Sequence, residues 1–423
     1  MNKIENLDEI TSLALQTGKI VCESSGETYR AEDTISIVGL SLGADKVEPY
    51  VTPTGVILYA EKNNEKTGDN QMCTRFVRVK NRSTNLGKIT AVNSLSRKIA
   101  TNRQNITYKE VETELAKIAN MKNYGFFWSV FASALSGFSF TSLFGGVLTD
   151  AFISAIIGAI MYAVLHLLSH LKLSVFISSL VGGGVISFAS GFAHSRGLVN
   201  NFSTLNIGTM MYLMSGTAIV IAIRDIIAGD YVSGTARSVE AFVVGLGLSV
   251  GVVAGLFVFP SAMDYDTSLP IITKPLPAFV YSAAASVAFA LVFQIKNKLH
   301  IFLISIAGGT SWLINIMLSN YGVSALQTCF LGAFFAGIIS EIFALVFKAP
   351  STVFFIPALI SFVPGSGLYA TMYNIVLGKS SAVMDSLLST ISIAGAIALA
   401  IAFATGGARM ISGFRRKLHF IKP

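Results

Sequence analysis

The sequence predicts a multi-pass α-helical membrane protein with about ten transmembrane (TM) helices in two halves of five, preceded by a small α+β domain. The 423 residues are 52% hydrophobic and 13% charged, and the mean hydropathy of +0.64 is too high for a soluble globule of this size. Residues 1–122 nevertheless hold 17 of the 31 Lys and Arg and 15 of the 23 Asp and Glu. We therefore divide the chain into a domain of residues 1–122 and two membrane halves, residues 123–262 and 263–423.

The N-terminal domain is predicted to contain four helices and three strands. Apolar residues at a helical period predict helices over Ile4–Val21, Thr28–Leu42, Leu86–Ala100 and Thr107–Asn120. Strands are predicted over Lys46–Thr52, Gly55–Ala60 and Cys73–Lys80, with a polar loop over Glu61–Gln71. The first thirty residues lack a basic stretch followed by an unbroken apolar run, so we expect no signal peptide and a cytoplasmic domain.

Ten apolar segments follow, and each approaches the ~20 residues that cross a bilayer. They are Phe126–Phe144, Ala151–Leu168, Leu173–Ala193, Leu205–Ile227, Ala241–Phe259, Ala278–Phe293, Ile301–Leu318, Ala325–Phe347, Val353–Leu377 and Leu387–Ala404. Ten crossings place both termini on one side of the membrane. The loops on that side carry more Lys and Arg than the opposite loops, which predicts a plasma-membrane protein with both termini in the cytoplasm.

The two membrane halves share a short internal repeat. Leu213–Gly229 and Phe362–Gly378 align without gaps at an offset of 149 residues, which puts Gly216 on Gly365. Each copy lies on the fourth segment of its half, and because five crossings are an odd number, the halves would have opposite orientations. Inverted repeats of this kind recur in secondary transporters, which bind substrate near the midplane between the repeats.

The repeated segments contain residues that interrupt helices. Pro364 removes a helix hydrogen bond, and Gly216 or Gly365 allows close backbone approach. A broken helix exposes backbone dipoles that hold a carboxylate or an ammonium group. The candidate substrate-binding residues are Ser215, Gly216, Thr217, Pro364, Gly365 and Ser366. The alternative is ordinary packing, because Gly, Ser and Thr are common at contacts between membrane helices.

Ionisable residues in the apolar segments form a second set of candidates. Glu341 lies in an otherwise apolar stretch, where a carboxyl group is costly unless it has a partner or faces water. It is a candidate proton carrier, with a structural, hydrogen-bonded carboxylic acid as the alternative. Arg224 and Asp225, two turns beyond Gly216, and Glu240 are candidates for proton coupling or for ion pairs. For Arg224, Asp225 and Asp230 an interfacial salt-bridge cluster is the simplest arrangement.

Composition and motifs argue against several other classes of function. The basic excess in residues 1–122 is only two (17 minus 15), which does not indicate a nucleic-acid partner. Cys22, Cys73 and Cys329 have neither metal-ligand nor disulfide spacing, so we expect no metal and no cofactor. The chain has no phosphate-binding loop or hydrolase signature, and we expect no enzyme and no nucleotide-driven pump.

A dense polar cluster, Glu23–Asp33, opens the second predicted helix. The simplest interpretation is local: Ser25 or Glu27 caps the helix, and Glu27, Arg30 and Asp33 share one face. The cluster, together with Val51–Gly55, also resembles the N-terminal domain of the threonine/serine exporter family. The motif residues are Glu27, Arg30, Glu32, Asp33, Thr52 and Thr54.

The membrane halves resemble the same family in Ile223–Gly234 and Phe362–Ser366. The resemblance implies a fused exporter with ten spans that moves small hydrophilic metabolites out of the cytoplasm, driven by the proton motive force. Members are associated with threonine and serine, and related two-chain systems with dicarboxylates such as succinate. Where the family usually has a Val-Pro-Gly turn, this chain has Leu213–Gly216 without a proline.

The leading hypothesis is therefore a threonine/serine exporter, an antiporter whose expected partners are the amino acid, protons and the lipid bilayer. An exporter of dicarboxylates, a passive channel, and a membrane-anchored enzyme or sensor whose N-terminal domain is active are the alternatives. One or two spans suffice to anchor a domain, so ten spans with ionisable groups favour a transport pathway. A homo-oligomer is left open.

Overall fold

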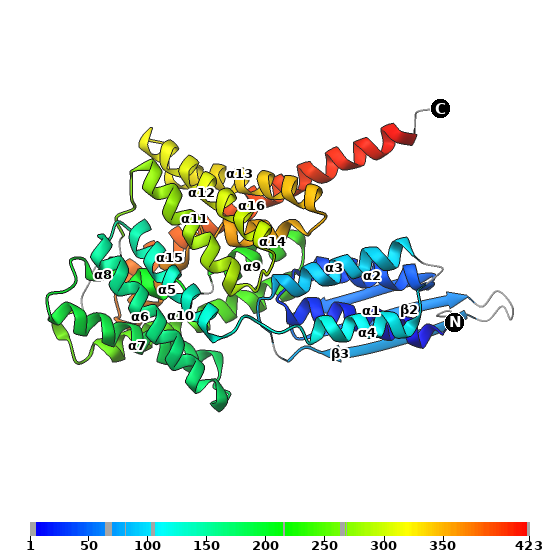
Figure 1. Ribbon diagram of the computed structural model, residues 1–423, viewed down its shortest axis with the longest axis horizontal. Coiled ribbons are helices and arrows are strands. Elements are labelled where there is room, and N and C mark those ends of the chain that lie inside the picture. Colours follow the sequence, from blue (N-terminus) through cyan, green and yellow to red (C-terminus); the bar gives the residue numbers. More distant parts are fainter. Residues whose placement is uncertain are drawn as a thin grey trace.

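The computed structural model describes residues 6–63, 70–80, 82–102, 106–214, 216–262, 267 and 269–420, without the side chains of Ser261 and residues 408–420. Figure 1 shows two parts side by side: helices and strands of the N-terminal region (blue to cyan) and a larger bundle of helices (cyan to red). We call residues 6–121 the N-terminal region and residues 126–420 the helical region.

The N-terminal region consists of four helices and a three-stranded sheet. They are α1 (Leu7–Glu23), α2 (Thr28–Leu42), β1 (Lys46–Thr52), β2 (Gly55–Asn63), β3 (Asn70–Arg78), α3 (Leu86–Thr101) and α4 (Tyr108–Ala119). The strands are antiparallel in the order β1-β2-β3. One face of β2 buries Val56 and Leu58 completely against α1 and its neighbours, which gives this region its own hydrophobic core.

One predicted loop in this region is partly strand. Residues 61–63 and 70–71, inside the expected loop Glu61–Gln71, extend β2 and β3, with Glu61 paired to Met72 and Asn63 to Asn70. Their side chains are half-buried or exposed, so polar residues there do not destabilise the strands. Cross-strand pairing therefore sets the length of β2 and β3. Residues 64–69 lie outside the described residues.

The helical region contains two series of helices. The first is α5 (Phe126–Leu143), α6 (Leu148–Leu168), α7 (Val175–Ser195), α8 (Phe202–Met210), α9 (Gly216–Ala228) and α10 (Tyr231–Leu256). The second is α11 (Pro275–Val292), α12 (Lys298–Asn320), α13 (Ala325–Phe347), α14 (Ser351–Ala358), α15 (Gly365–Val376) and α16 (Ser380–Phe420). Two short 3-10 helices, Ser169–Leu171 and Pro260–Ala262, lie in the connections.

Eight helices in the described part of the chain are long and apolar enough to cross a membrane: α5, α6, α7, α10, α11, α12, α13 and α16. The two other apolar segments, Leu205–Ile227 and Val353–Leu377, in which we expected Gly216 or Pro364 to interrupt a helix, are each divided into two short helices. The reason is local turn formation, described below. The chain is a multi-pass membrane protein.

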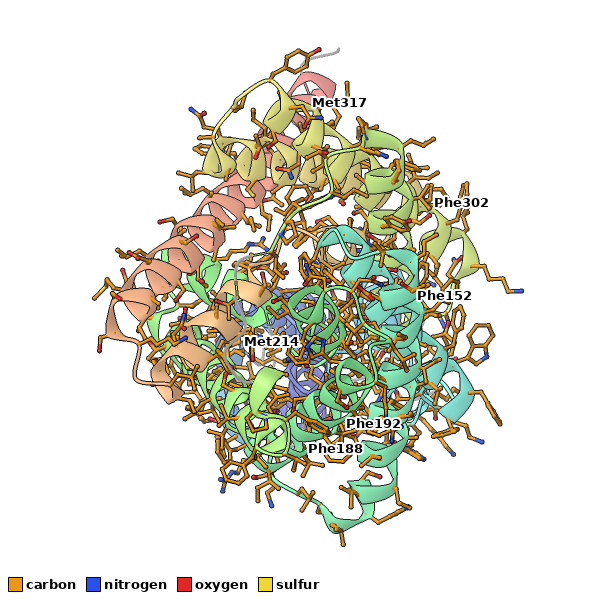
Figure 2. The ribbon with its side chains drawn as sticks, turned by 90° about the vertical axis from the view of Figure 1, so that its left-hand side faces the viewer. Phe152, Phe188, Phe192, Met214, Phe302 and Met317 are labelled. Carbon is orange, nitrogen blue, oxygen red and sulfur yellow. The ribbon has the colours of Figure 1, made fainter. Side chains whose placement is uncertain are left out.

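The outer surface of the helical region is apolar. Phe152 and Phe302 are 60% and 59% exposed and point outward at the edge of the region, whereas Met214 lies inside it and is 6% exposed (Figure 2). Large apolar side chains on the outside of a helical bundle suit contact with lipid. The interior is closely packed, since α10 lies against α7 and α16 lies against α13.

Three hydrogen bonds attach the N-terminal region, and Tyr124 in the segment that follows it, to the end of α11. The Leu86 amide donates to the Phe293 carbonyl at 2.9 Å, and the Tyr124 amide donates to Gln294 Oε1 at 2.6 Å. The Tyr124 hydroxyl also donates to the Ile295 carbonyl at 2.8 Å. These bonds satisfy free backbone groups at a helix start and a helix end, and so hold the two regions in a defined orientation.

The crossing of α7 and α10 gives a testable prediction. A methyl group on Gly251 would overlap the Leu180 carbonyl, whereas one on Gly395 of α16 would meet nothing within 4 Å. We expect Gly251→Ala to lower the free energy of unfolding by about 1–3 kcal/mol. Thermal unfolding in detergent, with Gly395→Ala as the matched control, measures the difference. Equal stability of the two variants would contradict this packing.

Candidate functional site at the two helix breaks

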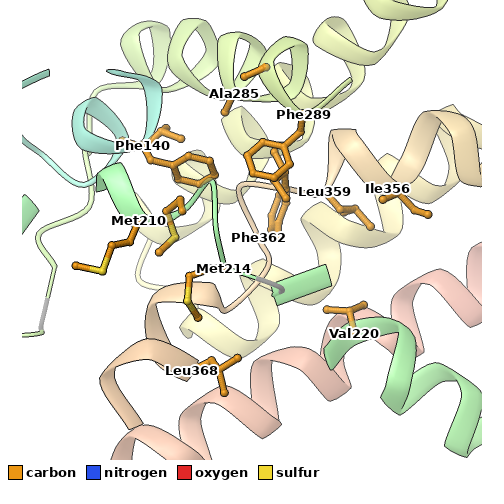
Figure 3. Packing of buried hydrophobic residues seen from close by; sticks show 14 of the residues in the cluster. Phe140, Met210, Met214, Val220, Ala285, Phe289, Ile356, Leu359, Phe362 and Leu368 are labelled. Atoms are coloured by element: carbon orange, nitrogen blue, oxygen red, sulfur yellow. The ribbon is translucent and has the colours of Figure 1, made fainter. Parts of the chain in front are cut away.

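The two interrupted helices meet at their breaks. A Cβ on Gly216 would overlap Val363 Cγ1 and lie 3.2 Å from Gly365 Cα, and a Cβ on Gly365 would lie 3.4 Å from Met214 Cβ. Met214 and Phe362, on the two linking segments, belong to the same buried hydrophobic cluster (Figure 3). The glycines aligned in the sequence are therefore in contact, and Gly216 has no room for a side chain.

The two links form by the same backbone turn. The Leu213 and Met214 amides donate to the Met210 carbonyl at 2.9 and 3.2 Å. At the same offset of 149 residues, the Phe362 and Val363 amides donate to the Leu359 carbonyl at 2.9 and 3.2 Å. Pro364 then precedes α15. The first link makes this turn without a proline, so proline is not what interrupts the helix there.

Aromatic rings and serines around the links repeat at similar spacing. Phe140 and Phe289 are in edge-to-face contact with ring centroids 6.0 Å apart, and each also contacts the phenylalanine four residues later in its own helix. Figure 3 shows these two rings together above the links. The Ser133 hydroxyl donates to the Gly158 carbonyl at 2.8 Å, and the Ser282 hydroxyl to the Gly308 carbonyl at 3.1 Å.

A small pocket lies beside the break on α9. Thr217 and Arg224 line it from α9, together with apolar residues that include Phe355 of α14 and Val363 of the second link. Its volume of about 20 Å³ is enough for a water but not for an amino acid. Thr217 is half-buried, as is Ser366 at the start of α15, while Pro364 and Gly365 are buried. Ser215 lies outside the described residues.

Arg224 joins this pocket to the N-terminal region. Its guanidinium forms an ion pair with Glu27 and donates to the Tyr29 hydroxyl at 3.1 Å. It also lies over the Tyr29 and Phe355 rings, 5.3 and 5.6 Å from their centroids. Arg30 donates to the other Glu27 oxygen at 3.0 Å, and the side chain of Glu27 is 3% exposed. Two motifs far apart in the sequence thus form one buried cluster.

Two further ion pairs lie at the same interface. Asp225 pairs with Arg237 at 3.1 Å, with side chains 2% and 10% exposed, and Arg237 also donates to the Gly26 carbonyl at 2.7 Å. Glu240 pairs with Arg82 at 2.8 Å. Arg224, Asp225 and Glu240 each have an ionic partner. The partners were not predicted, although Tyr29 lies inside the Glu23–Asp33 cluster; Arg82, Arg237 and Phe355 lie outside the motifs.

The other motif residues of the N-terminal region are local in their contacts. Glu32 accepts the Val51 amide at 3.1 Å; burial raises the pKa of this carboxyl, and that hydrogen bond partly offsets the effect. The Thr52 hydroxyl donates to the Gly55 carbonyl at 3.0 Å, and the Thr54 carbonyl accepts the Val79 amide. Asp33 is exposed. These contacts fasten α2 and the β1–β2 turn.

The expected cap on the second helix is absent. Glu27 occupies the N-cap position of α2, but its side chain makes no capping hydrogen bond. The carboxylate turns instead toward the two guanidinium groups, because charge-assisted bonds to arginine are stronger than a bond to a neutral amide. Glu27 and Arg30 do contact each other on one face of α2, but the same carboxylate also binds Arg224 of the helical region.

Glu341 lies apart from this cluster. It is half-buried on α13, six residues before the helix ends at Phe347, and has no hydrogen-bond or ion-pair partner among the residues that the structure describes. Its predicted role as a proton carrier stays a prediction.

Comparison with known families gives two matches. The family model ThrE, of threonine/serine exporters, matches residues 12–259, and a second threonine/serine exporter model, ThrE_2, matches residues 278–406. Neither the curated proteins nor the solved structures returned a match.

The buried pair of Asp225 and Arg237 gives a second prediction. We expect Arg237→Leu to destabilise the protein by about 3–5 kcal/mol, because it leaves a buried carboxylate without compensation. Adding Asp225→Leu should recover more than half of that loss. Unfolding of both single variants and the double variant in detergent tests this, and strictly additive losses would show that the two side chains do not interact.

Proposed function

The chain belongs to the threonine/serine exporter family, and from this premise we propose that it exports threonine and serine from the cytoplasm by secondary active transport, driven by the proton motive force. The observation that carries the proposal is the contact between two interrupted helices at Gly216 and Gly365. Interrupted helices at the midplane are where secondary transporters bind substrates and ions.

We propose that the membrane part is a pair of inverted five-span repeats, 123–262 and 263–423. Support comes from the turns at Met210 and Leu359, the Phe140–Phe289 contact and the serine bonds, which recur at offsets of 149 or 150 residues. In the packing, α9 lies against α10 and α16, and α15 against α16 and α10. Each repeat thus packs its half-helix on the other repeat.

In this arrangement, α8 with α9 and α14 with α15 each supply one crossing, which completes ten spans. An even number of spans places both termini on one side of the membrane. The basic loops on that side favour a cytoplasmic location for both termini, with the protein in the plasma membrane. The N-terminal region is then a cytoplasmic domain attached to the inner end of the pathway.

The proposed substrate site lies between the starts of α9 and α15. Helix starts carry partial positive charge and attract a carboxylate. Thr217 and Ser366, one residue beyond each glycine, supply hydroxyl groups to the polar side chain of threonine or serine. Because the adjoining pocket has a volume of only about 20 Å³, we infer that α9 and α14 must separate to admit a substrate.

One observation favours small dicarboxylates as the second candidate substrate. The links and the first turns of α9 and α15, residues 211–219 and 359–368, contain no Asp or Glu that would hold an ammonium group. Two converging helix starts suit two carboxylates equally well.

Transport measurements test the substrate and the driving force. Purified protein in liposomes should move labelled threonine and serine when a proton gradient is imposed, and much more slowly without it. Labelled succinate in the same vesicles tests the second candidate. The proposal fails if neither amino acid crosses in a gradient-dependent manner.

A separate test concerns Glu341, the proposed proton carrier. We expect Glu341→Gln to abolish gradient-driven accumulation while exchange of threonine across the membrane continues, because the amide cannot release a proton at working pH. Asp385→Asn, an exposed carboxylate at the start of α16, is the matched control and should transport normally. Undiminished accumulation by Glu341→Gln would show that this carboxylate is structural.

A further inference from the structure

Arg224 is placed to bind a carboxylate at the pocket beside the break. Thr217 and Arg224 line the same pocket from one face of α9, and seven residues separate them by about 10 Å along the helix axis. A guanidinium group binds carboxylates through two parallel hydrogen bonds and does so better than any other side chain. Threonine, serine and dicarboxylates all carry that group.

In the structure, the guanidinium group of Arg224 is already bound by a carboxylate of the protein itself. Glu27, which is held by Arg30 on its other oxygen, reaches Arg224 from the N-terminal region. Tyr29 covers the guanidinium from the same side. The side chains of Arg224 and Glu27 are only 12% and 3% exposed, so a ligand that binds Arg224 must first displace Glu27.

The ion pair is not needed to attach the N-terminal region. Leu86, Tyr124, Arg237 and Arg82 already join the two regions through other bonds. A buried ion pair is also a poor source of stability, because desolvation offsets much of the attraction. The ion pair of Glu27 and Arg224 therefore needs an explanation other than stability. Arg224 lies on α9, and the other end of this half-helix forms the break.

The corresponding positions in the second half of the membrane part carry no charged residues. At the offset of 149 residues, Arg224 and Asp225 correspond to Tyr373 and Asn374 in α15, both buried. A charged pair required by the repeat architecture itself would be expected in both halves. The arginine occurs only where the N-terminal region can reach it.

We propose that Arg224 is a carboxylate-binding residue of the transport pathway and that Glu27 is a tethered competitor, which keeps α9 in its closed position until the substrate carboxylate replaces it. This inference rests on the proposed function: it adds a residue that binds the substrate carboxylate before the substrate reaches the starts of α9 and α15, and it names the group that controls access. The N-terminal region thereby sets the substrate concentration at which transport begins.

Binding measurements on the purified full chain test the competition. Glu27→Gln keeps the shape of the side chain and removes its charge, so the affinity for threonine should rise about fivefold or more. The affinity for threoninol, which lacks the carboxylate, should not change. Arg224→Lys keeps the positive charge but loses the bidentate geometry, and should weaken threonine binding. Arg82→Gln, which breaks a different ion pair at the interface, is the matched control and should leave both affinities unchanged.

Hydrogen exchange supplies a readout that does not depend on transport. Threonine or succinate should accelerate exchange in residues 24–30 of the wild-type protein, and threoninol should not; in Glu27→Gln, exchange there should be fast without any ligand. If carboxylates accelerate exchange but no flux is found, the competition between Glu27 and a bound carboxylate holds, and the proposed function fails. If flux occurs while Glu27→Gln behaves like Arg82→Gln, or if no carboxylate alters exchange, the inference is overturned.

Discussion

The contact between Gly216 and Gly365 is the constraint on which the helical region depends. A helix that stops inside a bilayer leaves backbone groups that must be satisfied by protein, because lipid offers no hydrogen bonds. Here each interrupted helix ends in a tight turn, and the following half-helix begins against the other break. The surrounding helices pack so that this irregular backbone lies in protein, with Phe140 and Phe289 beside it.

The half-helix α9 connects that centre to the N-terminal region. Its first residue touches the second break, and its Arg224 lies eight positions later at the surface where Glu27 is buried. A movement of α9 would therefore change the contact between Gly216 and Gly365 and the ion pair between Arg224 and Glu27 together. Since α15 carries Tyr373 in place of the arginine, the two breaks are alike in backbone but differ in charge, and only one of them is exposed to control from the N-terminal region.

Much of the secondary structure was predictable, because hydrophobic periodicity is a local property. Elements such as Thr28–Leu42 and Ala325–Phe347 have the predicted bounds. The errors have physical causes: the hairpin of β2 and β3 extends into polar residues because strand pairing, not composition, sets its length. Gly216 marked the first break in the sequence, but with no proline nearby the residue at which α8 ends, Met210, was not predicted.

The candidate site divides in the same way. From the sequence alone came the membrane class, the alignment of Gly216 with Gly365, and the selection of Glu27, Arg224, Asp225 and Glu240, because rare residue types in apolar or motif contexts are visible without coordinates. Only the tertiary structure decided that Glu27 meets Arg224, that Asp225 pairs with Arg237 and that Glu341 stands apart. Glu27 and Arg224 are 197 positions apart, and Asp225 and Arg237 lie on different helices, so both ion pairs depend on how whole helices pack.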